Sequence, residues 1–336
     1  NMNFYSNKNV LVTGGNGFVG SYVVERLLDE QANVSIVSRT SKDFLLHVKD
    51  KIRFLKGDLL NKDDALEACK NQDFVFHLAS RVAGIGYNIE HSGTMMTDNS
   101  IMSLNMLDAA RISNVERYQY VSSTCVYPRE ASIPTPESEG MLGDPEKSNL
   151  GYGWAKRVGE LQAKMHAEEF DMKVSIIRPM NLYGPRDDFD PKTSHVIPAL
   201  IKKIIDAEKK VSIWGSGNAT RAFAYVDDVA RGMLLALEKL TLPEPINIGT
   251  NEEIKIKDLV SMIINIANRN DLVVEYDTTK PEGQLRKTAS TTRAEELIQY
   301  KPKYTLEEGL KKTIEWYSKN HKRQGHVDES SLLEHN

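Results

Sequence analysis

The chain has 336 residues, of which 40% are hydrophobic and 27% charged, and its formal net charge is −4. A chain of this length exceeds the size at which a single core stops growing, so we expect a large domain with a smaller lobe. The weak negative charge excludes a basic surface for nucleic acid, no apolar run reaches the roughly 20 residues of a membrane span, and two cysteines are too few for a disulfide framework. We therefore expect a cytoplasmic protein that binds neither nucleic acid nor a membrane.

Short apolar runs alternate with amphipathic stretches through the first half of the chain. Strands are predicted at residues 9–13, 33–38, 52–56, 74–78, 118–122 and 174–178, and helices at 21–30, 62–70, 101–110 and 152–170. Runs such as VLV and FVF are apolar on both sides of the pleat, as in buried parallel strands. The alternation predicts an α/β fold with a Rossmann-type doubly wound parallel sheet.

Past residue 178 this alternation gives way to loops rich in proline, glycine and aspartate. Helices are predicted there at residues 197–207, 227–240, 256–267 and 306–318. We assign residues 1–178 and about 221–250 to the large domain, 179–220 and 251–318 to a smaller C-terminal α/β lobe, and 319–336 to a disordered tail. Open doubly wound sheets bind ligands beyond the carboxyl ends of their strands, so the loops that follow the strands should line the site.

The first predicted strand runs directly into Gly14-x-x-Gly17-x-x-Gly20 and then into a helix. Glycine permits the tight turn and the close approach of the backbone, and a helix N-terminus offers free N–H groups and a positive dipole to a pyrophosphate. The motif therefore predicts a dinucleotide site in the large domain, with Phe18 and Val19 within the turn. At the ends of later strands, the predicted cofactor contacts are Leu59, Ala79 and Pro179.

The end of the second strand indicates which dinucleotide is bound. A carboxylate there binds a ribose 2′-hydroxyl and repels a 2′-phosphate, but this chain has Ser38 and Arg39. Arginine pairs with a phosphate through two hydrogen bonds, so we predict NADP, with NAD as the alternative. Asp58, after the third strand, is predicted to accept a hydrogen bond from the adenine amino group.

Tyr152 and Lys156 lie four residues apart in GYGWAKRVGE, so on a helix both point to the same face. Lowering a tyrosine pKa from about 10 to about 7 needs roughly 4 kcal/mol of preference for the phenolate. One ammonium about 4 Å away supplies energy of that order at an effective dielectric of about 20. The pair therefore predicts proton transfer to or from a substrate oxygen, with Ser123 as the hydroxyl that positions this oxygen and Ser122 or Thr124 as alternatives.

The segments TGGNGFVG, HLAS, VSSTCVYP, YGWAK, RPMNLYGP and RAFAYVDD, in this order, resemble the extended short-chain dehydrogenase/reductases that epimerise, dehydrate or reduce nucleotide sugars. The resemblance covers about residues 8–318. It implies a nicotinamide dinucleotide cofactor, a nucleotide-sugar substrate, a triad of Ser123, Tyr152 and Lys156, and a homodimer packed through the helices near 101–111 and 152–170. In this family the lysine also holds the ribose hydroxyls of the cofactor. No metal site is predicted.

The residues after the triad serine narrow the reaction. Dehydratases of this family carry an Asp-Glu pair there, whereas this chain has Thr124 and Cys125. Such a cysteine, together with His195 in PKTSHVIPAL, resembles the GDP-L-fucose synthases, which epimerise C3 and C5 of a 4-keto sugar and reduce C4. Unperturbed pKa values near 8.5 and 6.5 suit Cys125 and His195 to exchange protons beside the ketone at neutral pH. The same resemblance places three residues on the diphosphate or base of a substrate that we expect to be GDP-linked: Asn181, Arg221 and Arg286.

Other features resemble related enzymes. The glycine turn is closer to that of general sugar epimerases, and GIGYN is similar to a substrate loop of the GDP-mannose 3,5-epimerases, which share the cysteine. Those enzymes have a lysine in the region of His195 and an acid at the end of the second strand. Ser38, Arg39 and His195 therefore favour a reductase of a 4-keto hexose or heptose. The alternatives are an NAD-dependent 3,5- or 4-epimerase without net reduction and, more remotely, a non-catalytic dinucleotide-sensing protein, a class that lacks the tyrosine and lysine.

Overall fold

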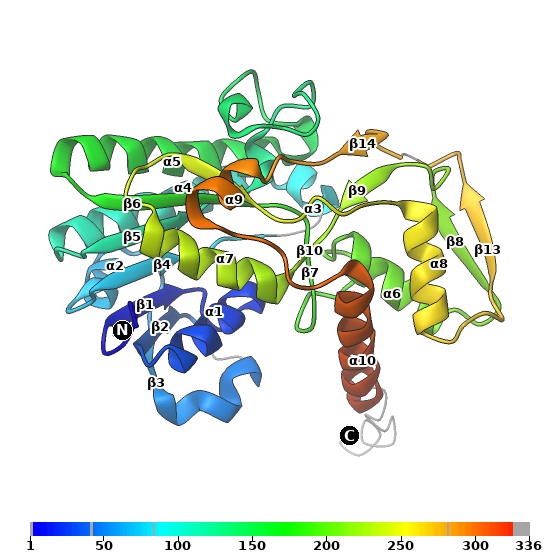
Figure 1. The fold of residues 1–336 in the computed structure, drawn as a ribbon, viewed down its shortest axis with the longest axis horizontal. Coiled ribbons are helices and arrows are strands. Elements are labelled where there is room, and N and C mark those ends of the chain that lie inside the picture. The colour runs from blue at the N-terminus through cyan, green and yellow to red at the C-terminus, as the bar shows by residue number, and fades with distance from the viewer. Residues whose placement is uncertain (1–2, 41–42, 83–84, 281, 325–336) are drawn as a thin grey trace, which may run out of the picture.

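A computed structural model describes residues 3–40, 43–82, 85–280 and 282–324 (Figure 1). Its central sheet is parallel throughout, with seven strands in the order β11-β6-β5-β4-β1-β2-β3. These strands are β1 (Asn9–Thr13), β2 (Asn33–Ser38), β3 (Ile52–Lys56), β4 (Phe74–His77), β5 (Arg117–Val121), β6 (Lys173–Pro179) and β11 (Pro245–Ile248). This strand order is that of a Rossmann fold with one added edge strand, so the predicted fold class is confirmed.

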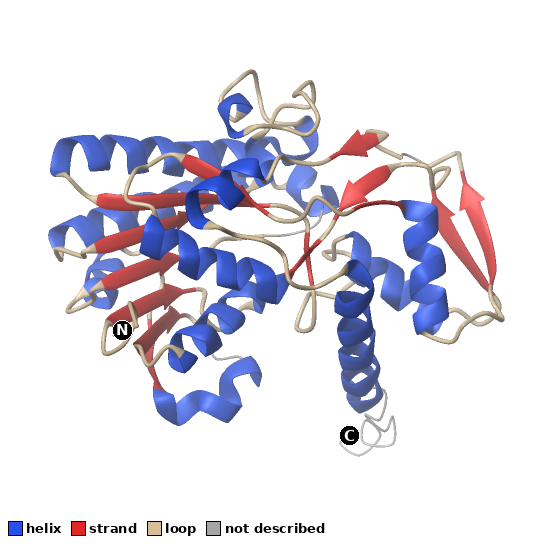
Figure 2. Ribbon diagram, in the orientation of Figure 1, coloured by secondary structure: helices blue, strands red, loops and turns tan. Residues whose placement is uncertain are grey.

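Helices cover both faces of the central sheet (Figure 2). One face carries α1 (Phe18–Asp29), α7 (Val226–Lys239) and α9 (Thr292–Ile298), and the other carries α2 (Lys62–Cys69), α4 (Ser92–Ile112) and α5 (Leu150–Phe170). In α7 the buried positions Val229, Met233 and Leu237 recur at helical spacing, which turns one apolar stripe toward the sheet. Short helices connect these elements: η1 (Asp43–Lys51), α3 (Ile85–Glu90), η2 (Thr124–Val126), η3 (Glu137–Glu139) and η4 (Lys147–Asn149).

The smaller lobe has its own hydrophobic core, built largely from the second half of the chain. Its helices are α6 (Val196–Asp206), α8 (Ile256–Ile266) and α10 (Leu306–Gln324). Its strands form three small sheets: β13 (Val273–Asp277) with β8 (Lys210–Trp214), β10 (Ala224–Tyr225) with β7 (Leu182–Tyr183), and β12 (Glu253–Lys255) with β9 (Thr220–Ala222) and β14 (Arg286–Lys287). The predicted α/β character of this lobe is confirmed.

Two predicted boundaries need correction. The segment 289–300, expected in the smaller lobe, packs on the central sheet, because Ala289, Ala294 and Ile298 are buried in the core beneath α7. Helix α10 continues through Gln324, so the first residues of the predicted tail 319–336 are helical. Residues 325–336 of that tail lie outside the described residues. Within the described ranges, none of the helices is both long enough and apolar enough to span a membrane.

Candidate functional site

The glycine turn connects β1 to α1 with no room for larger residues. Gly14 has φ +67°, and a Cβ there would lie 3.1 Å from the backbone that follows β4. At Gly20 a Cβ would lie 2.1 Å from the Gly14 carbonyl oxygen. Gly17 caps α1 without a side chain, the helix opens with Phe18 and Val19, and its first turn has no acidic residue. The N–H groups and the positive dipole of this turn therefore fit the pyrophosphate of a dinucleotide.

The predicted contacts of the adenosine half lie beside this turn. Ser38 ends β2, and its Oγ accepts a hydrogen bond from Asn16 Nδ2 of the glycine turn at 3.1 Å. Arg39 follows directly and is exposed to solvent. Asp58 Oδ1 accepts from the Leu60 backbone N–H at 3.1 Å, so this carboxylate also stabilises its own loop. Ser38 and Arg39 thus occupy the position that would contact a 2′-phosphate on the adenosine ribose.

The remaining predicted cofactor contacts follow strands β3, β4 and β6. Leu59 is buried, the Ala79 N–H donates to Thr13 Oγ1 at 3.0 Å, and Pro179 ends β6. Thr13 Oγ1 lies 2.8 Å from His77 Nδ1, and burial lowers the pKa of His77 to about 3. This buried pair joins the carboxyl ends of β1 and β4 beside the glycine turn.

Three of the predicted chemical residues meet at the carboxyl end of β5. Tyr152 and Lys156 are both buried on α5, and Lys156 Nζ lies 5.4 Å from the centroid of the Tyr152 ring. Lys156 Nζ also donates to the Val121 carbonyl at 2.9 Å. The hydroxyls of Ser123, two residues after β5, and Ser80, after β4, lie close enough to the Tyr152 hydroxyl to lower its pKa. Ser80 belongs to the HLAS motif, and its place after a strand of the sheet could have indicated this role.

Burial controls the protonation of this cluster. Burial raises the pKa of Tyr152 well above its usual value, the Cys125 thiolate acts in the same direction, and the serine hydroxyls oppose both. Burial also lowers the pKa of Lys156 to about 8, against the attraction of Cys125 and Glu160. The expected lowering of the Tyr152 pKa toward 7 is therefore not produced by the chain itself, since desolvation outweighs the two serine hydroxyls that lower this pKa. At neutral pH Tyr152 holds a proton that it can donate, beside a charged Lys156.

Cys125 lies within this cluster. It belongs to η2, and its backbone N–H donates to Ser123 Oγ at 3.1 Å. The thiol is free and partly exposed, and it lies close enough to Tyr152 and Lys156 to raise the pKa of both. The structure therefore brings the predicted cysteine to the predicted triad.

His195 lies in the smaller lobe, where it caps α6 at the protein surface. Partial desolvation by its neighbours lowers the pKa of its imidazole, and the Asp188 carboxylate opposes this effect. Within the described parts of the chain, no hydrogen bond or ion pair joins His195 to Cys125 or to the triad. The structure thus places the two predicted proton-exchange residues on different lobes.

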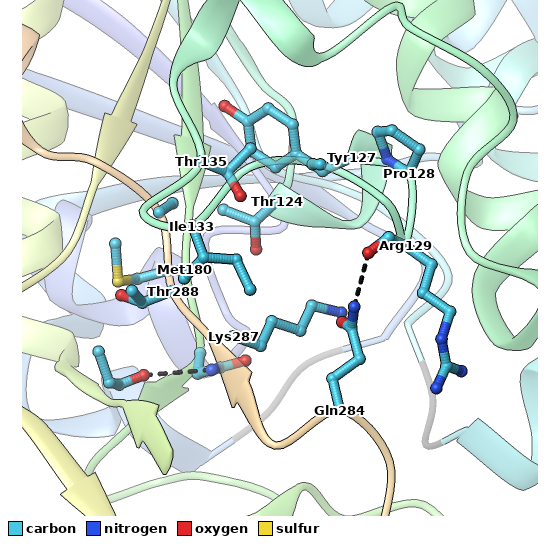
Figure 3. Close-up of a pocket in the computed structure, with 14 residues that line it drawn as sticks. Thr124, Tyr127, Pro128, Arg129, Ile133, Thr135, Met180, Gln284, Lys287 and Thr288 are labelled. Atoms are coloured by element: carbon cyan, nitrogen blue, oxygen red, sulfur yellow. Dashed lines mark hydrogen bonds between the residues drawn. The ribbon is translucent and has the colours of Figure 1, made fainter. Parts of the chain in front are cut away.

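A pocket adjoins the strand end that carries Ser123 (Figure 3). Its wall combines loops of the large domain with the segment around β14 and includes Thr124, Tyr127, Arg129, Asn181, Gln284 and Lys287. In Figure 3, Lys287 and Gln284 extend from one side across from Thr124 and Tyr127. The lining leaves out Ser123, Cys125 and Tyr152, so the pocket lies next to the triad rather than around it.

The predicted arginines of the substrate site take different positions. Strand β14 pairs with β9 so that Lys287 lies opposite Arg221 and Arg286 opposite Thr220. Because side chains alternate along a strand, Arg286 and Lys287 point to opposite faces. Arg286 is exposed and binds both carboxylate oxygens of Glu253, at 2.8 and 2.9 Å. The structure therefore places Lys287, which the sequence reasoning missed within KPEGQLRK, in the pocket in place of Arg286.

Polar and cationic groups gather on this side of the pocket. Asn181 Nδ2 donates to the Ala222 carbonyl at 3.1 Å, and Arg221 Nη1 donates to the Gln284 carbonyl at 2.8 Å. Two further cations, Arg129 and Lys287, lie 3.8 and 2.9 Å from the carboxylate of Glu146. Arg129, Arg221 and Lys287 outnumber the two carboxylates that act on Arg221, Glu146 and Glu282, which suits the region to an anionic ligand such as a diphosphate.

A Rossmann sheet, a glycine turn that fits a pyrophosphate and a buried serine, tyrosine and lysine at the carboxyl ends of the strands define a dinucleotide-dependent enzyme of the short-chain dehydrogenase/reductase class. The chain belongs to the NAD dependent epimerase/dehydratase family, which it matches over residues 10–249. This membership confirms the predicted family and the predicted nicotinamide dinucleotide cofactor.

Relatives of known activity match nearly the whole chain. A GDP-L-fucose synthase of Sinorhizobium fredii is 33% identical, over 93% of this chain and 96% of that protein. A dTDP-4-dehydro-6-deoxy-D-allose reductase of a Streptomyces species is 30% identical, over 95% and 98%. The crystal structure of a GDP-L-fucose synthetase from Naegleria fowleri bound to NADP superposes with a TM-score of 0.80 at 28% identity, over 94% of each chain. These relatives confirm the predicted enzyme class, an NAD(P)-dependent epimerase or reductase of nucleotide sugars.

Proposed function

We propose that this protein epimerises and then reduces a 4-keto sugar nucleotide with NADPH, in the manner of a GDP-L-fucose synthase, and that the substrate is GDP-linked. The observation that carries the proposal is Cys125, which lies against the Ser123, Tyr152 and Lys156 cluster at the edge of a pocket built by both lobes. A reductase of a 4-keto sugar needs the cluster alone. An epimerase acting beside the ketone also needs an acid or base such as this thiol.

In the reduction, a bound NADPH supplies hydride to C4 of the sugar. Ser123 positions the C4 oxygen by a hydrogen bond, and Tyr152 donates its proton to that oxygen as the ketone becomes a hydroxyl. The high pKa of Tyr152 in the chain suits this direction, because the residue is protonated before the step. The neighbouring Lys156 ammonium then stabilises the phenolate that remains until solvent returns a proton.

In the epimerisation, Cys125 and His195 exchange protons at the carbons beside the ketone. Inversion of a carbon requires a base on one face and an acid on the other. Cys125 comes from the large domain and His195 from the smaller lobe, so a substrate held between the lobes would meet one residue on each face. Arg221 and Lys287 bind the diphosphate of the same substrate, with Asn181 beside them.

Net consumption of NADPH tests the proposal. Purified protein is incubated with 4-keto-6-deoxy sugars linked to GDP, dTDP, CDP and UDP, and absorbance at the nicotinamide band is followed. We expect oxidation of NADPH with the GDP-linked ketone. Conversion of a GDP-hexose without any net change in NADPH would instead support a 3,5- or 4-epimerase with tightly held NAD.

The preference for NADP over NAD rests on Arg39. We expect wild-type protein to bind NADPH about tenfold or more tightly than NADH, because the guanidinium pairs with the 2′-phosphate. Arg39→Ala should remove this difference mainly by weakening NADPH binding, measured by calorimetry. Arg53→Ala, a change at another exposed arginine, is the control. Equal binding of the two dinucleotides by the wild type would contradict the prediction.

The exposed faces of α4 and α5 support the predicted homodimer. These helices pack against each other, with Gln162 Nε2 donating to the Leu104 carbonyl at 3.0 Å. Apolar side chains on both helices remain exposed: Ile101 at 37%, Leu104 at 42%, Leu161 at 40% and Met165 at 60%. An apolar patch of this kind on two adjacent helices suits burial against a second copy.

We therefore expect a dimer in light scattering after size-exclusion chromatography. Met165→Glu should yield a monomer, because a charge would be buried without a partner. Leu242→Glu, at an exposed apolar residue in the loop after α7, should leave the mass unchanged. A wild-type monomer would refute the assignment.

A further inference from the structure

Besides the predicted pair Tyr152 and Lys156, helix α5 carries a third residue at the end of β5, Glu160. Tyr152, Lys156 and Glu160 recur every four residues and therefore lie along one face of the helix. Lys156 donates to the Val121 carbonyl at 2.9 Å, and Glu160 Oε1 accepts from Ser122 Oγ at 2.5 Å. The residue directly before the predicted triad serine is thus fixed by a carboxylate that neither motif nor family resemblance indicated.

Glu160 is held by a buried arginine. Arg178 Nε and Nη2 donate to the two carboxylate oxygens of Glu160 at 2.8 and 2.6 Å, and the side chains are 1% and 0% exposed. At Gly140 a Cβ would lie 2.4 Å from Arg178 Nη2, so the absence of a side chain there leaves space for the guanidinium. These two parallel hydrogen bonds are shielded from solvent, and they fix the orientation of the Glu160 carboxylate toward Ser122.

The same arginine reaches the wall of the pocket. Arg178 Nη1 donates to the Tyr127 hydroxyl at 3.0 Å and to the Glu137 carbonyl at 2.8 Å. The Tyr127 hydroxyl in turn donates to Asn247 Oδ1 at 2.5 Å. Because Tyr127 lines the pocket, one buried network connects the pocket wall to the strand end that carries the triad serine.

The charge of Glu160 also acts on Lys156. Its carboxylate raises the pKa of Lys156 and so opposes the burial that lowers this pKa to about 8. The other titratable or charged groups that face these two residues are His77 from β4, Tyr120 from β5, Cys125 from η2, Tyr152 and Arg157 from α5, and Arg178 from β6. Only Cys125 among them also favours the charged form of Lys156. Loss of the Glu160 charge should therefore let Lys156 lose its proton at lower pH.

We propose that Glu160, oriented by Arg178, is a positioning residue of the redox step: it fixes the strand end that presents Ser123 and keeps Lys156 charged while Tyr152 transfers its proton. The inference rests on the proposed function for its kinetic consequences. Glu160 touches no reacting atom and acts through Ser122 and Lys156.

The test separates charge from positioning. The double variant Glu160→Gln/Arg178→Met removes both buried charges together, and Ser122→Ala removes the hydrogen bond but keeps the ion pair. We expect kcat to fall at least tenfold in the double variant. The alkaline limb of its pH–rate profile should shift to lower pH by about one unit. Ser122→Ala should lower kcat by about tenfold without moving the limb, since the Glu160 charge remains. Glu67→Gln, on the exposed side of α2, is the control for both.

A second readout does not depend on the substrate. Acylation of Lys156 by a small reagent, followed by peptide mass spectrometry from pH 6 to 11, reports the pKa of its amine in the free enzyme. We expect a lower midpoint in the double variant than in wild type or Ser122→Ala. If the wild type is inactive on every nucleotide sugar, the proposed function is refuted. The acylation midpoints of wild type and double variant still test the effect of Glu160 on Lys156 in that case.

The proposal is overturned if the double variant binds dinucleotide normally and matches the wild type in three quantities. These are kcat, the alkaline limb of the pH–rate profile, and the midpoint of Lys156 acylation. If the double variant does not fold, Ser122→Ala decides: an unchanged kcat in this variant overturns the positioning role.

Discussion

Replacement of Tyr152 by phenylalanine should leave dinucleotide binding intact and lower kcat by about 10³-fold, the range expected for loss of a general acid. The ring of Tyr152 is buried on α5 and still packs, but the proton for the C4 oxygen is gone. The measurement is stopped-flow oxidation of NADPH with the 4-keto sugar nucleotide, beside calorimetric binding of the dinucleotide. Lys156→Ala should lower both the rate and the dinucleotide affinity.

A matched control for this change lies in strand β5, beside the site. Tyr118 is buried in β5, and its hydroxyl has no hydrogen-bond partner among the described residues. Tyr118→Phe should therefore retain the wild-type rate. Near wild-type turnover of Tyr152→Phe would show that another group donates the proton.

Replacement of Cys125 by serine, or of His195 by alanine, should separate epimerisation from reduction. Serine keeps the size of the side chain but cannot ionise near neutral pH, and alanine removes the partner on the opposite lobe. Each variant should bind dinucleotide and sugar nucleotide, and should incorporate deuterium from heavy water at fewer carbons or at least 100-fold more slowly. Mass spectrometry and proton NMR of the product measure the incorporation, and hydride transfer to the unepimerised ketone should persist.

The controls are Cys69→Ala, at a cysteine buried against α4 and β5, and His47→Ala, at an exposed histidine. Both should exchange deuterium as the wild type does. If both Cys125→Ser and His195→Ala exchange deuterium at the wild-type rate, the 3,5-epimerase part of the proposal is wrong. The protein would then be a simple 4-reductase or 4-epimerase that needs only Ser123, Tyr152 and Lys156.

Sequence reasoning located the parts of the site that depend on local order. The glycine turn is contiguous, Tyr152 and Lys156 share one helix, and parallel strands bring Ser123 to the same edge of the sheet as the turn. These relations follow from helical spacing and strand direction alone. They needed no knowledge of how distant segments pack.

The parts that sequence reasoning missed depend on tertiary packing. The choice between Arg286 and Lys287 depends on the register of a two-residue strand, and a shift of one residue exchanges the two faces. Arg178 lies in a strand that reads as apolar, and its partner Glu160 is 18 residues away on a helix. A buried charge is stable only when paired, but the sequence does not say which charges are buried.

The path of the chain between the lobes has a consequence for its synthesis. Residues 1–179 contain the first six strands, but the edge strand β11 and the covering helices α7 and α9 follow only between residues 226 and 298. During synthesis the first six strands therefore emerge before α7 and α9, which cover one apolar face of the sheet. At ordinary elongation rates this face stays incompletely covered for roughly 10 s. During that interval the nascent chain exposes apolar surface of the kind that chaperones bind, and we expect residues 1–179 expressed alone to be less stable than the full chain.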